Sequence, residues 1–157
     1  MEQAMPAPSQ TLKRKSFTYH VDVAWLENRA GTLSSEGKPS FRVASPPEFK
    51  GEAGTWSPED LFVAAVNACT MTTFIALATR LQIPLVSYTS DAEGTLEFVD
   101  GGYTFTNVVL RPVIEVGSAE AVLQAEHTIH AAHKNCLITN SVKSRVVVEP
   151  VIRIRGE

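Results

Sequence analysis

The sequence predicts an α+β fold with antiparallel sheet, and three observations lead to that prediction. Segments that alternate apolar and polar residues, as half-buried strands do, stand before, between and after two helical segments. Glycine- or proline-containing turns separate most of these segments. The resulting order is β-β-α-β-β-α-β, which is typical of α+β domains. With 157 residues, 44% of them hydrophobic, the chain can build one substantial core.

The amino-terminal residues divide into a tail and a predicted strand. Residues 1–16 are rich in Ala, Pro, Ser and Gln without periodicity, so we expect a disordered tail. The remainder, residues 17–157, is expected to be a single domain. Alternation over residues 17–25 predicts its first strand, and residues 28–31 supply a turn.

A returning strand and a long loop follow that turn. The strand is expected within residues 32–43, interrupted at residues 37–39 by Gly-Lys-Pro. Residues 44–56 form the loop, and loops of this length in compact domains are often functional. Phe49 and Trp56 lie in this loop and could line an apolar pocket or only fix the loop.

The clearest local signal is the start of a long helix. Ser57 is a good N-cap, Pro58 suits the first helical position, and Asp60 stands three residues after the cap. The helix should run from Leu61 to about Leu81 and is apolar or small nearly all round. Such a helix must be buried on most sides, by sheet or by a second chain.

The second half of the chain predicts a hairpin, a helix and a strand. Strands over residues 85–98 and 103–116 flank an Asp-Gly-Gly turn. Ser118 is expected to cap a helix from Ala119 to about Lys134. A last strand is expected over residues 142–155, where valine and isoleucine alternate with other residues.

Composition argues against several functional classes. The net charge is −3 and the only basic run, residues 13–15, is short, so we expect no nucleic-acid partner. We find no stretch approaching about 20 apolar residues without charges or caps, and therefore expect no membrane span. No apolar run follows the first basic residues, so a secretory signal is not expected. We place the protein in the cytoplasm, where a permanent disulfide is disfavoured.

The two cysteines, Cys69 and Cys136, are the residues most suited to chemistry. Each could be a buried small hydrophobe, the commoner role for cysteine. Cys69 lies within the apolar helix, which would raise its pKa and make it inert unless a cation stabilises the thiolate. Three arginines are candidates for that cation: Arg29, Arg42 and Arg80.

The histidines near Cys136 and the carboxylate of Glu59 each have an alternative interpretation. His127, His130, His133 and Cys136 recur every three residues, which spreads them around a helix rather than converging on one ion. We therefore expect no metal ion and no other cofactor, with a metal site through His130, His133 and Cys136 as the least favoured hypothesis. Glu59 in the first helical turn could act only on the helix dipole.

Two motifs resemble the signatures of the family of osmotically inducible protein C and organic hydroperoxide resistance protein (OsmC/Ohr). The first is Ser-Pro-Glu-Asp-Leu-Phe-Val-Ala-Ala-Val-Asn-Ala-Cys, residues 57–69. The second is His-Lys-Asn-Cys, residues 133–136, followed by Thr-Asn-Ser at 139–141. Residues 25–31 also look like the family's opening hairpin. The resemblance spans about residues 17–154.

This resemblance implies a thiol-dependent peroxidase. It implies an intertwined homodimer in which antiparallel sheets wrap around long central helices. Cys69 would be the thiol that attacks a hydroperoxide, and Cys136 the thiol that resolves its sulfenate as a disulfide. Arg29 and Glu59 would hold the first thiol, and a dihydrolipoyl-type dithiol would be the reductant. We add Phe49, Trp56 and Leu137 as candidate substrate-pocket residues.

Geometry and departures from the family pattern refine these expectations. Glu59 precedes Cys69 by ten residues, about 15 Å along a straight helix, so we expect a site at or near a dimer interface. Leu137 stands where family peroxidases commonly have proline, and the opening turn lacks a glycine pair. A divergent branch is therefore expected, with Arg42 as the reserve arginine. The competing hypothesis is a non-catalytic module that binds an apolar ligand or senses redox state.

Overall fold

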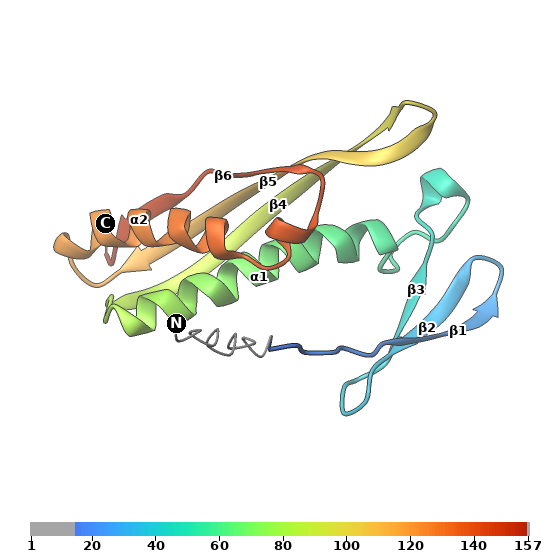
Figure 1. The fold of residues 1–157 in the computed structure, drawn as a ribbon, viewed down its shortest axis with the longest axis horizontal. Coiled ribbons are helices and arrows are strands. Elements are labelled where there is room, and N and C mark those ends of the chain that lie inside the picture. The colour runs from blue at the N-terminus through green and yellow to red at the C-terminus, as the bar shows by residue number, and fades with distance from the viewer. Residues whose placement is uncertain (1–14, 157) are drawn as a thin grey trace, which may run out of the picture.

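The structure, a computed structural model, describes residues 15–156, and the predicted tail therefore lies almost wholly outside the described residues. Two sheets and two long helices form the fold, and the three-stranded sheet stands apart from the larger one (Figure 1). The elements in chain order are β1 (Asp22–Glu27), β2 (Ala30–Ser34), β3 (Phe41–Ala44), α1 (Pro58–Arg80), β4 (Leu85–Val99), β5 (Gly102–Val116), α2 (Glu120–Asn135), β6 (Arg145–Val148) and β7 (Val151–Ile154). Two short 3-10 turns complete it: η1 (Pro47–Phe49) and η2 (Thr139–Ser141).

The three-stranded sheet is antiparallel in the order β1-β2-β3. Its first strand begins at Asp22, so the expectation of a strand from Phe17 was wrong at that end. Asp22 pairs with Ser34, the last residue of β2, and no strand residue remains to pair with the residues before Asp22. The alternating apolar side chains from Phe17 to Trp25 are exposed in the single chain.

Helix α1 begins as the sequence predicts. Ser57 accepts a hydrogen bond from the Asp60 N–H, and the Asp60 carboxylate accepts one from the Ser57 N–H, which completes a capping box. One stripe of the helix is buried within the chain, at Val66, Thr70, Phe74 and Ala78. Phe74 packs on Tyr88 of β4, with ring centroids 5.6 Å apart.

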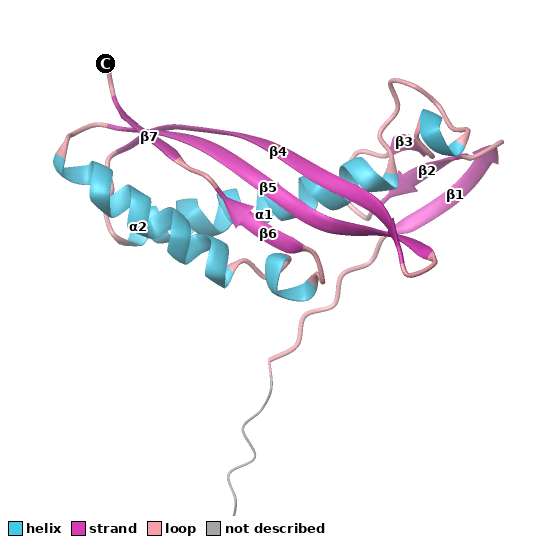
Figure 2. Ribbon diagram, turned by 90° about the horizontal axis from the view of Figure 1, so that it is seen from above, coloured by secondary structure: helices cyan, strands magenta, loops and turns pink. Residues whose placement is uncertain are grey.

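The four-stranded sheet is mixed, which corrects the expectation of antiparallel sheet alone. Strands β4 and β5 form the predicted antiparallel hairpin, but β6 and β7 both pair with β5 in parallel. The single last strand expected from the sequence is two strands, because Pro150 lacks an N–H and interrupts the ladder. The two helices lie along this sheet (Figure 2), and alternate residues of β5, from Val108 to Val116, are buried and contribute to the core.

Helix α2 packs against α1 and β7. Its N-cap is Ala119, with no side-chain hydrogen bond, so the assignment of Ser118 as cap was wrong. The carboxylate of Glu120 is the acceptor at this end of the helix. A hydrogen bond from its own backbone N–H and one from the Ser118 side chain lower the pKa of this carboxyl. The helix ends at Asn135, and the chain then enters η2 through Cys136.

The outer face of α1 is left open by its own chain. Positions 65, 68, 72, 75 and 79, three or four residues apart, and the adjacent position 76 are all exposed, and all carry Ala, Thr or Ile. The helix has the length and hydropathy of a membrane span, with 22% of the relevant window buried, contrary to the expectation that no stretch qualifies. A helix apolar on all sides is either a core helix or a membrane helix. Here α1 packs against α2 and β4 of its own domain.

Candidate functional site

The structure brings Cys69 and Cys136 together. Cys69 lies in the middle of α1, beside the buried Thr70, and Cys136 lies just after the last residue of α2. Because these helices pack against each other, the Cys69 thiol lies close enough to Cys136 to affect the pKa of its thiol. Both cysteines are free thiols in the structure. Cys136 is fully buried, whereas Cys69 is half-buried.

The turn after α2 holds the Cys136 sulfur in place. The Thr139 N–H donates a hydrogen bond to Cys136 Sγ at 3.4 Å, and the Asn140 N–H donates to the Cys136 carbonyl at 3.0 Å. The Asn140 side chain also donates to the Lys134 carbonyl at 3.2 Å, which satisfies an acceptor in the last turn of α2. The Thr-Asn-Ser run of the second motif therefore has a direct structural purpose.

These contacts decide the acidity of Cys136. Burial alone would raise the pKa of its thiol, but the neighbouring Cys69 thiol, the hydroxyl and N–H of Thr139, and the Thr70 hydroxyl outweigh burial and lower the pKa. A thiolate next to a second thiol is the arrangement that thiol redox chemistry requires. Sequence reasoning missed both threonines, although each stands in or beside a quoted motif.

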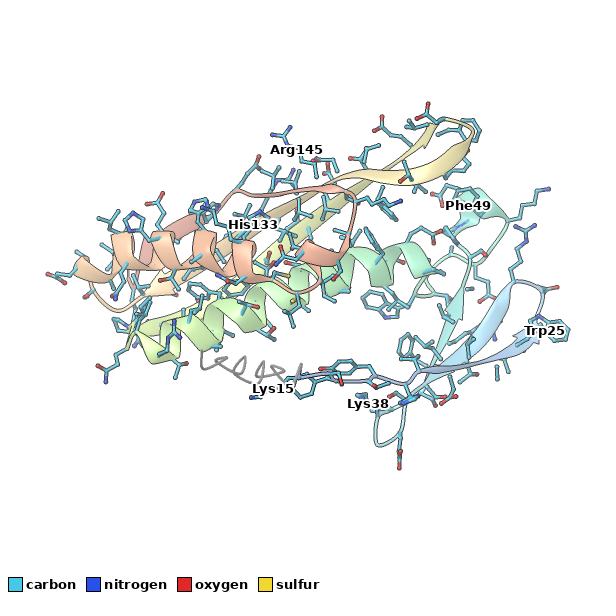
Figure 3. All side chains as sticks on the ribbon, viewed as in Figure 1. Lys15, Trp25, Lys38, Phe49, His133 and Arg145 are labelled. Carbon is cyan, nitrogen blue, oxygen red and sulfur yellow. The ribbon has the colours of Figure 1, made fainter. Side chains whose placement is uncertain are left out.

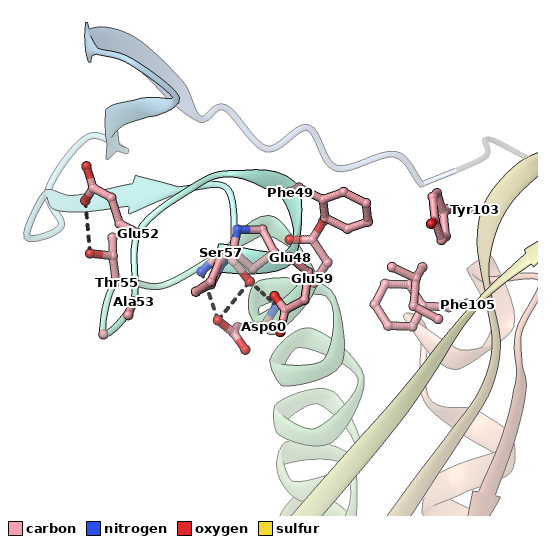
Figure 4. Close-up of a pocket in the computed structure, with 14 residues that line it drawn as sticks. Glu48, Phe49, Glu52, Ala53, Thr55, Ser57, Glu59, Asp60, Tyr103 and Phe105 are labelled. Atoms are coloured by element: carbon pink, nitrogen blue, oxygen red, sulfur yellow. Dashed lines mark hydrogen bonds between the residues drawn. The ribbon is translucent and has the colours of Figure 1, made fainter.

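A second group of candidate residues lies at the start of α1. Glu59 is half-buried, and its Oε2 is buried with no hydrogen-bond partner among the described residues. It lines a pocket of about 710 Å³ between η1, the start of α1 and the β4–β5 hairpin (Figure 4). Phe49, Tyr103 and Phe105 supply aromatic walls there, and Phe49 meets Tyr103 edge to face at 5.2 Å between centroids.

Arg29 belongs to this second group and not to the cysteine pair. Its Nη1 donates to the Phe49 carbonyl at 2.6 Å, and it borders a shallow groove with Pro58. Within residues 15–156 it forms no ion pair with Glu59. The predicted arginine and glutamate therefore lie at one end of α1, and the predicted thiols lie near its middle.

Arg42, the reserve arginine, is already occupied. It donates to both carboxylate oxygens of Glu52, at 2.8 and 2.5 Å, and to Glu27 at 3.1 Å. The hydrogen bonds to Glu52 and then to Glu27 raise the pKa of Arg42, and the bond from Arg42 lowers the pKa of Glu52. This cluster braces the loop before α1 and directs the Nε and Nη2 donors of Arg42 to Glu52 and Glu27 instead of to a thiolate.

The predicted pocket residues do not converge on one place. Phe49, labelled in Figure 3 at the turn η1, lines the aromatic pocket, whereas Trp56 lines a separate hollow along α1 and β4. Leu137 is 74% exposed on the turn after Cys136. Tyr103 and Phe105, which the sequence did not single out, reach the pocket through strand pairing far along the chain. Among the described residues, no group of three His, Cys, Asp or Glu side chains could hold a metal ion.

Comparison with known proteins identifies close structural relatives. The family model described as OsmC-like protein matches residues 51–151. An OsmC-like protein of unknown function from Vibrio cholerae is 30% identical, with a TM-score of 0.78 over 87% of this chain and 100% of its own. An organic hydroperoxide resistance protein OsmC from Legionella pneumophila, described as a predicted redox protein, is 25% identical, with a TM-score of 0.70 over 89% and 99%. No curated protein matches the chain.

Proposed function

The chain belongs to the OsmC-like protein family, and we propose that it is a thiol-dependent peroxidase that reduces organic hydroperoxides. The observation that carries the proposal is the closeness of Cys69 to Cys136, whose buried sulfur accepts a hydrogen bond from the Thr139 N–H. The Legionella relative, named for organic hydroperoxide resistance, supports the choice of substrate class. We assign the protein to the cytoplasm, where reduced thiols are maintained.

The reaction needs only the two thiols, a peroxide and an external dithiol. The Cys69 thiolate attacks the distal peroxide oxygen, the O–O bond breaks, and the alcohol leaves after taking a proton. Cys69 is then a sulfenic acid. Cys136 attacks its sulfur, releases water and forms the Cys69–Cys136 disulfide. A dithiol restores both thiols by exchange and is itself oxidised to a disulfide.

The assignment of Cys69 as the attacking thiol rests on access. Cys136 has no exposed surface, whereas Cys69 is half-buried on α1 and can meet a small substrate. Cys69 also lies beside Cys136, close enough to lower the pKa of the Cys136 thiol. Oxidation therefore produces the sulfenic acid next to the thiol that can resolve it.

We further propose that a second copy of the chain completes the site. Glu59 is too far along α1 to reach Cys69 of the same chain, since ten helical residues span about 15 Å, and Arg29 is held at the same end by its hydrogen bond to the Phe49 carbonyl. The outer face of α1 and the alternating apolar strip from Phe17 to Trp25 are both exposed. Two antiparallel copies would cover these surfaces and bring the buried, unpartnered Glu59 carboxylate of one chain toward the thiols of the other.

The aromatic pocket favours a second candidate function, a module that binds an apolar ligand. Its volume and its phenylalanine and tyrosine walls suit a drug-sized hydrophobic molecule. In that case the thiols would report redox state without turnover. Ligand affinity that survives Cys69→Ser, together with slow peroxide consumption by the wild type, would favour this alternative.

The test is steady-state consumption of an organic hydroperoxide with a dihydrolipoyl donor or a thioredoxin-type donor. We expect the dihydrolipoyl donor to support turnover, Cys69→Ser to abolish it, and Cys136→Ser to impair it. Glu59→Gln should lower turnover, whereas Glu48→Gln, on the same pocket wall, is the matched control. Full activity in Cys69→Ser or in Glu59→Gln would contradict the roles assigned to those residues.

A further inference from the structure

We propose that the reductant attacks the sulfur of Cys69 and that Cys136 is the leaving group when the disulfide is reduced. The inference rests on the proposed function, because it concerns the disulfide which that function forms. It is carried by two features of the described residues: the unequal burial of the two sulfurs, and the donors that surround Cys136.

Access favours Cys69 as the point of attack. A thiolate approaches a disulfide from the side opposite the leaving sulfur. Cys136 is 0% exposed, enclosed by the end of α2 and the turn η2, so no such approach to its sulfur exists without opening the turn. The sulfur of Cys69 must already be reachable for a peroxide to meet it. The same opening admits a thiol.

The surroundings of Cys136 stabilise the charge that a leaving sulfur acquires. The Thr139 N–H already donates to Cys136 Sγ at 3.4 Å. The Thr139 hydroxyl lies close enough to lower the pKa of this thiol, yet its oxygen is buried and forms no hydrogen bond of standard geometry with any described residue. A thiolate at Cys136 would give that hydroxyl an acceptor. Thiols of lower pKa are better leaving groups in disulfide exchange.

The exchange balances in two steps. One thiolate of the dithiol forms a bond to Cys69 Sγ, the Cys69–Cys136 bond breaks, and its electron pair stays on Cys136 Sγ, which then takes a proton. The second thiolate of the dithiol attacks its own partner sulfur in the mixed disulfide. Cys69 leaves as a thiolate, and the dithiol closes as a cyclic disulfide, so two electrons pass from the dithiol to the protein.

The direction of attack can be read from peptide masses. The oxidised protein is treated briefly with 2-mercaptoethanol, a monothiol that lacks the second thiol needed for rapid intramolecular closure, then quenched with acid before a second molecule reacts and alkylated with N-ethylmaleimide. Trypsin cleaves after Lys50, Arg80, Lys134 and Lys143, which places Cys69 and Cys136 on separate peptides, 51–80 and 135–143. We expect 2-mercaptoethanol on peptide 51–80 and N-ethylmaleimide on peptide 135–143. The reverse pattern, or an even split between the peptides, would overturn the proposal.

A failure of the proposed peroxidase function can be distinguished from a failure of the proposed direction of disulfide exchange. If peroxide forms no disulfide, the same mapping is done on protein oxidised with diamide, which makes the disulfide without a peroxidase reaction. The adduct pattern then still decides which sulfur is attacked. A missing peroxide reaction with the expected adduct would therefore overturn the peroxidase and leave the direction of exchange standing.

Thr139 provides an independent test of the leaving group. Thr139→Val removes the hydroxyl and should slow reduction of the disulfide by about tenfold, as expected for one hydrogen bond to a charged group, while peroxide oxidation of Cys69 stays within about twofold. Thr139→Ser keeps a hydroxyl and should retain the wild-type rate. Thr128→Val, which deletes another buried hydroxyl, is the matched control. Equal slowing of both half-reactions in Thr139→Val, or no change in either, would overturn the role of this hydroxyl.

Discussion

The exposed face of α1 leads to a prediction about assembly: Ile75→Asp should separate the proposed dimer into monomers. Ile75 is 38% exposed in the single chain and lies on the face formed by Ala, Thr and Ile. In a monomer the new carboxylate can turn to water, so the folded chain loses about 2 kcal/mol, through helix propensity and through the burial that Ile75 already has in the single chain. In a dimer the same carboxylate is short, cannot extend to solvent, and is buried without a partner.

The size of the effect follows from symmetry. Losing the remaining burial of one isoleucine costs about 1 kcal/mol, and burying an unpaired charge costs at least about 2 kcal/mol more. A two-fold interface contains the substitution twice, which gives about 6 kcal/mol. At about 1.4 kcal/mol per tenfold, the dimer dissociation constant should rise by about four orders of magnitude.

Sedimentation equilibrium over a range of protein concentrations measures this constant. Leu123→Asp is the matched control, because Leu123 is 60% exposed on α2, away from the face in question. We expect Leu123→Asp to stay dimeric and Ile75→Asp to be a folded monomer by circular dichroism. A monomeric wild type, or an Ile75→Asp variant that dimerises as tightly as the wild type, would refute the reasoning.

Two further predictions concern stability. Phe74 is fully buried against Tyr88, so Phe74→Ala should lower the free energy of unfolding by about 3 to 5 kcal/mol, measured by guanidinium denaturation at fixed protein concentration; a loss below about 1 kcal/mol would show that this core position is loosely packed. Burial is the main cause that lowers the pKa of His133 below its ordinary 6.5. The unfolded chain therefore binds a proton at this residue more readily than the folded chain, and the free energy of unfolding should fall as the pH drops below 6.5. His133→Gln should flatten the melting temperature between about pH 7 and pH 5; an unchanged slope would assign the pH dependence to other groups.

Local signals predicted the helices and the main hairpin well. The Ser57 to Asp60 capping box and the apolar run behind it define α1, because capping and periodicity act within a few residues. The limits of the strands were less predictable. The alternation before Asp22 is typical of a strand, but the partner strand β2 ends at Ser34, which pairs with Asp22. The parallel pairing of β6 and β7 with β5 depends on long-range topology, which period-two alternation does not contain.

The site was predictable only in part, for the same reason. Cys69 and Cys136 could be identified as candidate residues, but their proximity depends on how α1 packs against α2. The Thr139 contacts require the turn that follows Cys136. The aromatic pocket joins Phe49 to Tyr103 and Phe105 across more than fifty residues of sequence, so no local pattern could reveal it.

The pairing of two thiols for peroxide chemistry is tested most directly by intact mass after one equivalent of an organic hydroperoxide. We predict that the wild type loses two hydrogen atoms and that neither cysteine then reacts with N-ethylmaleimide. Cys136→Ser should instead gain one oxygen atom on Cys69. An unchanged wild-type mass, with both thiols still free to be alkylated, would contradict the proposed reaction.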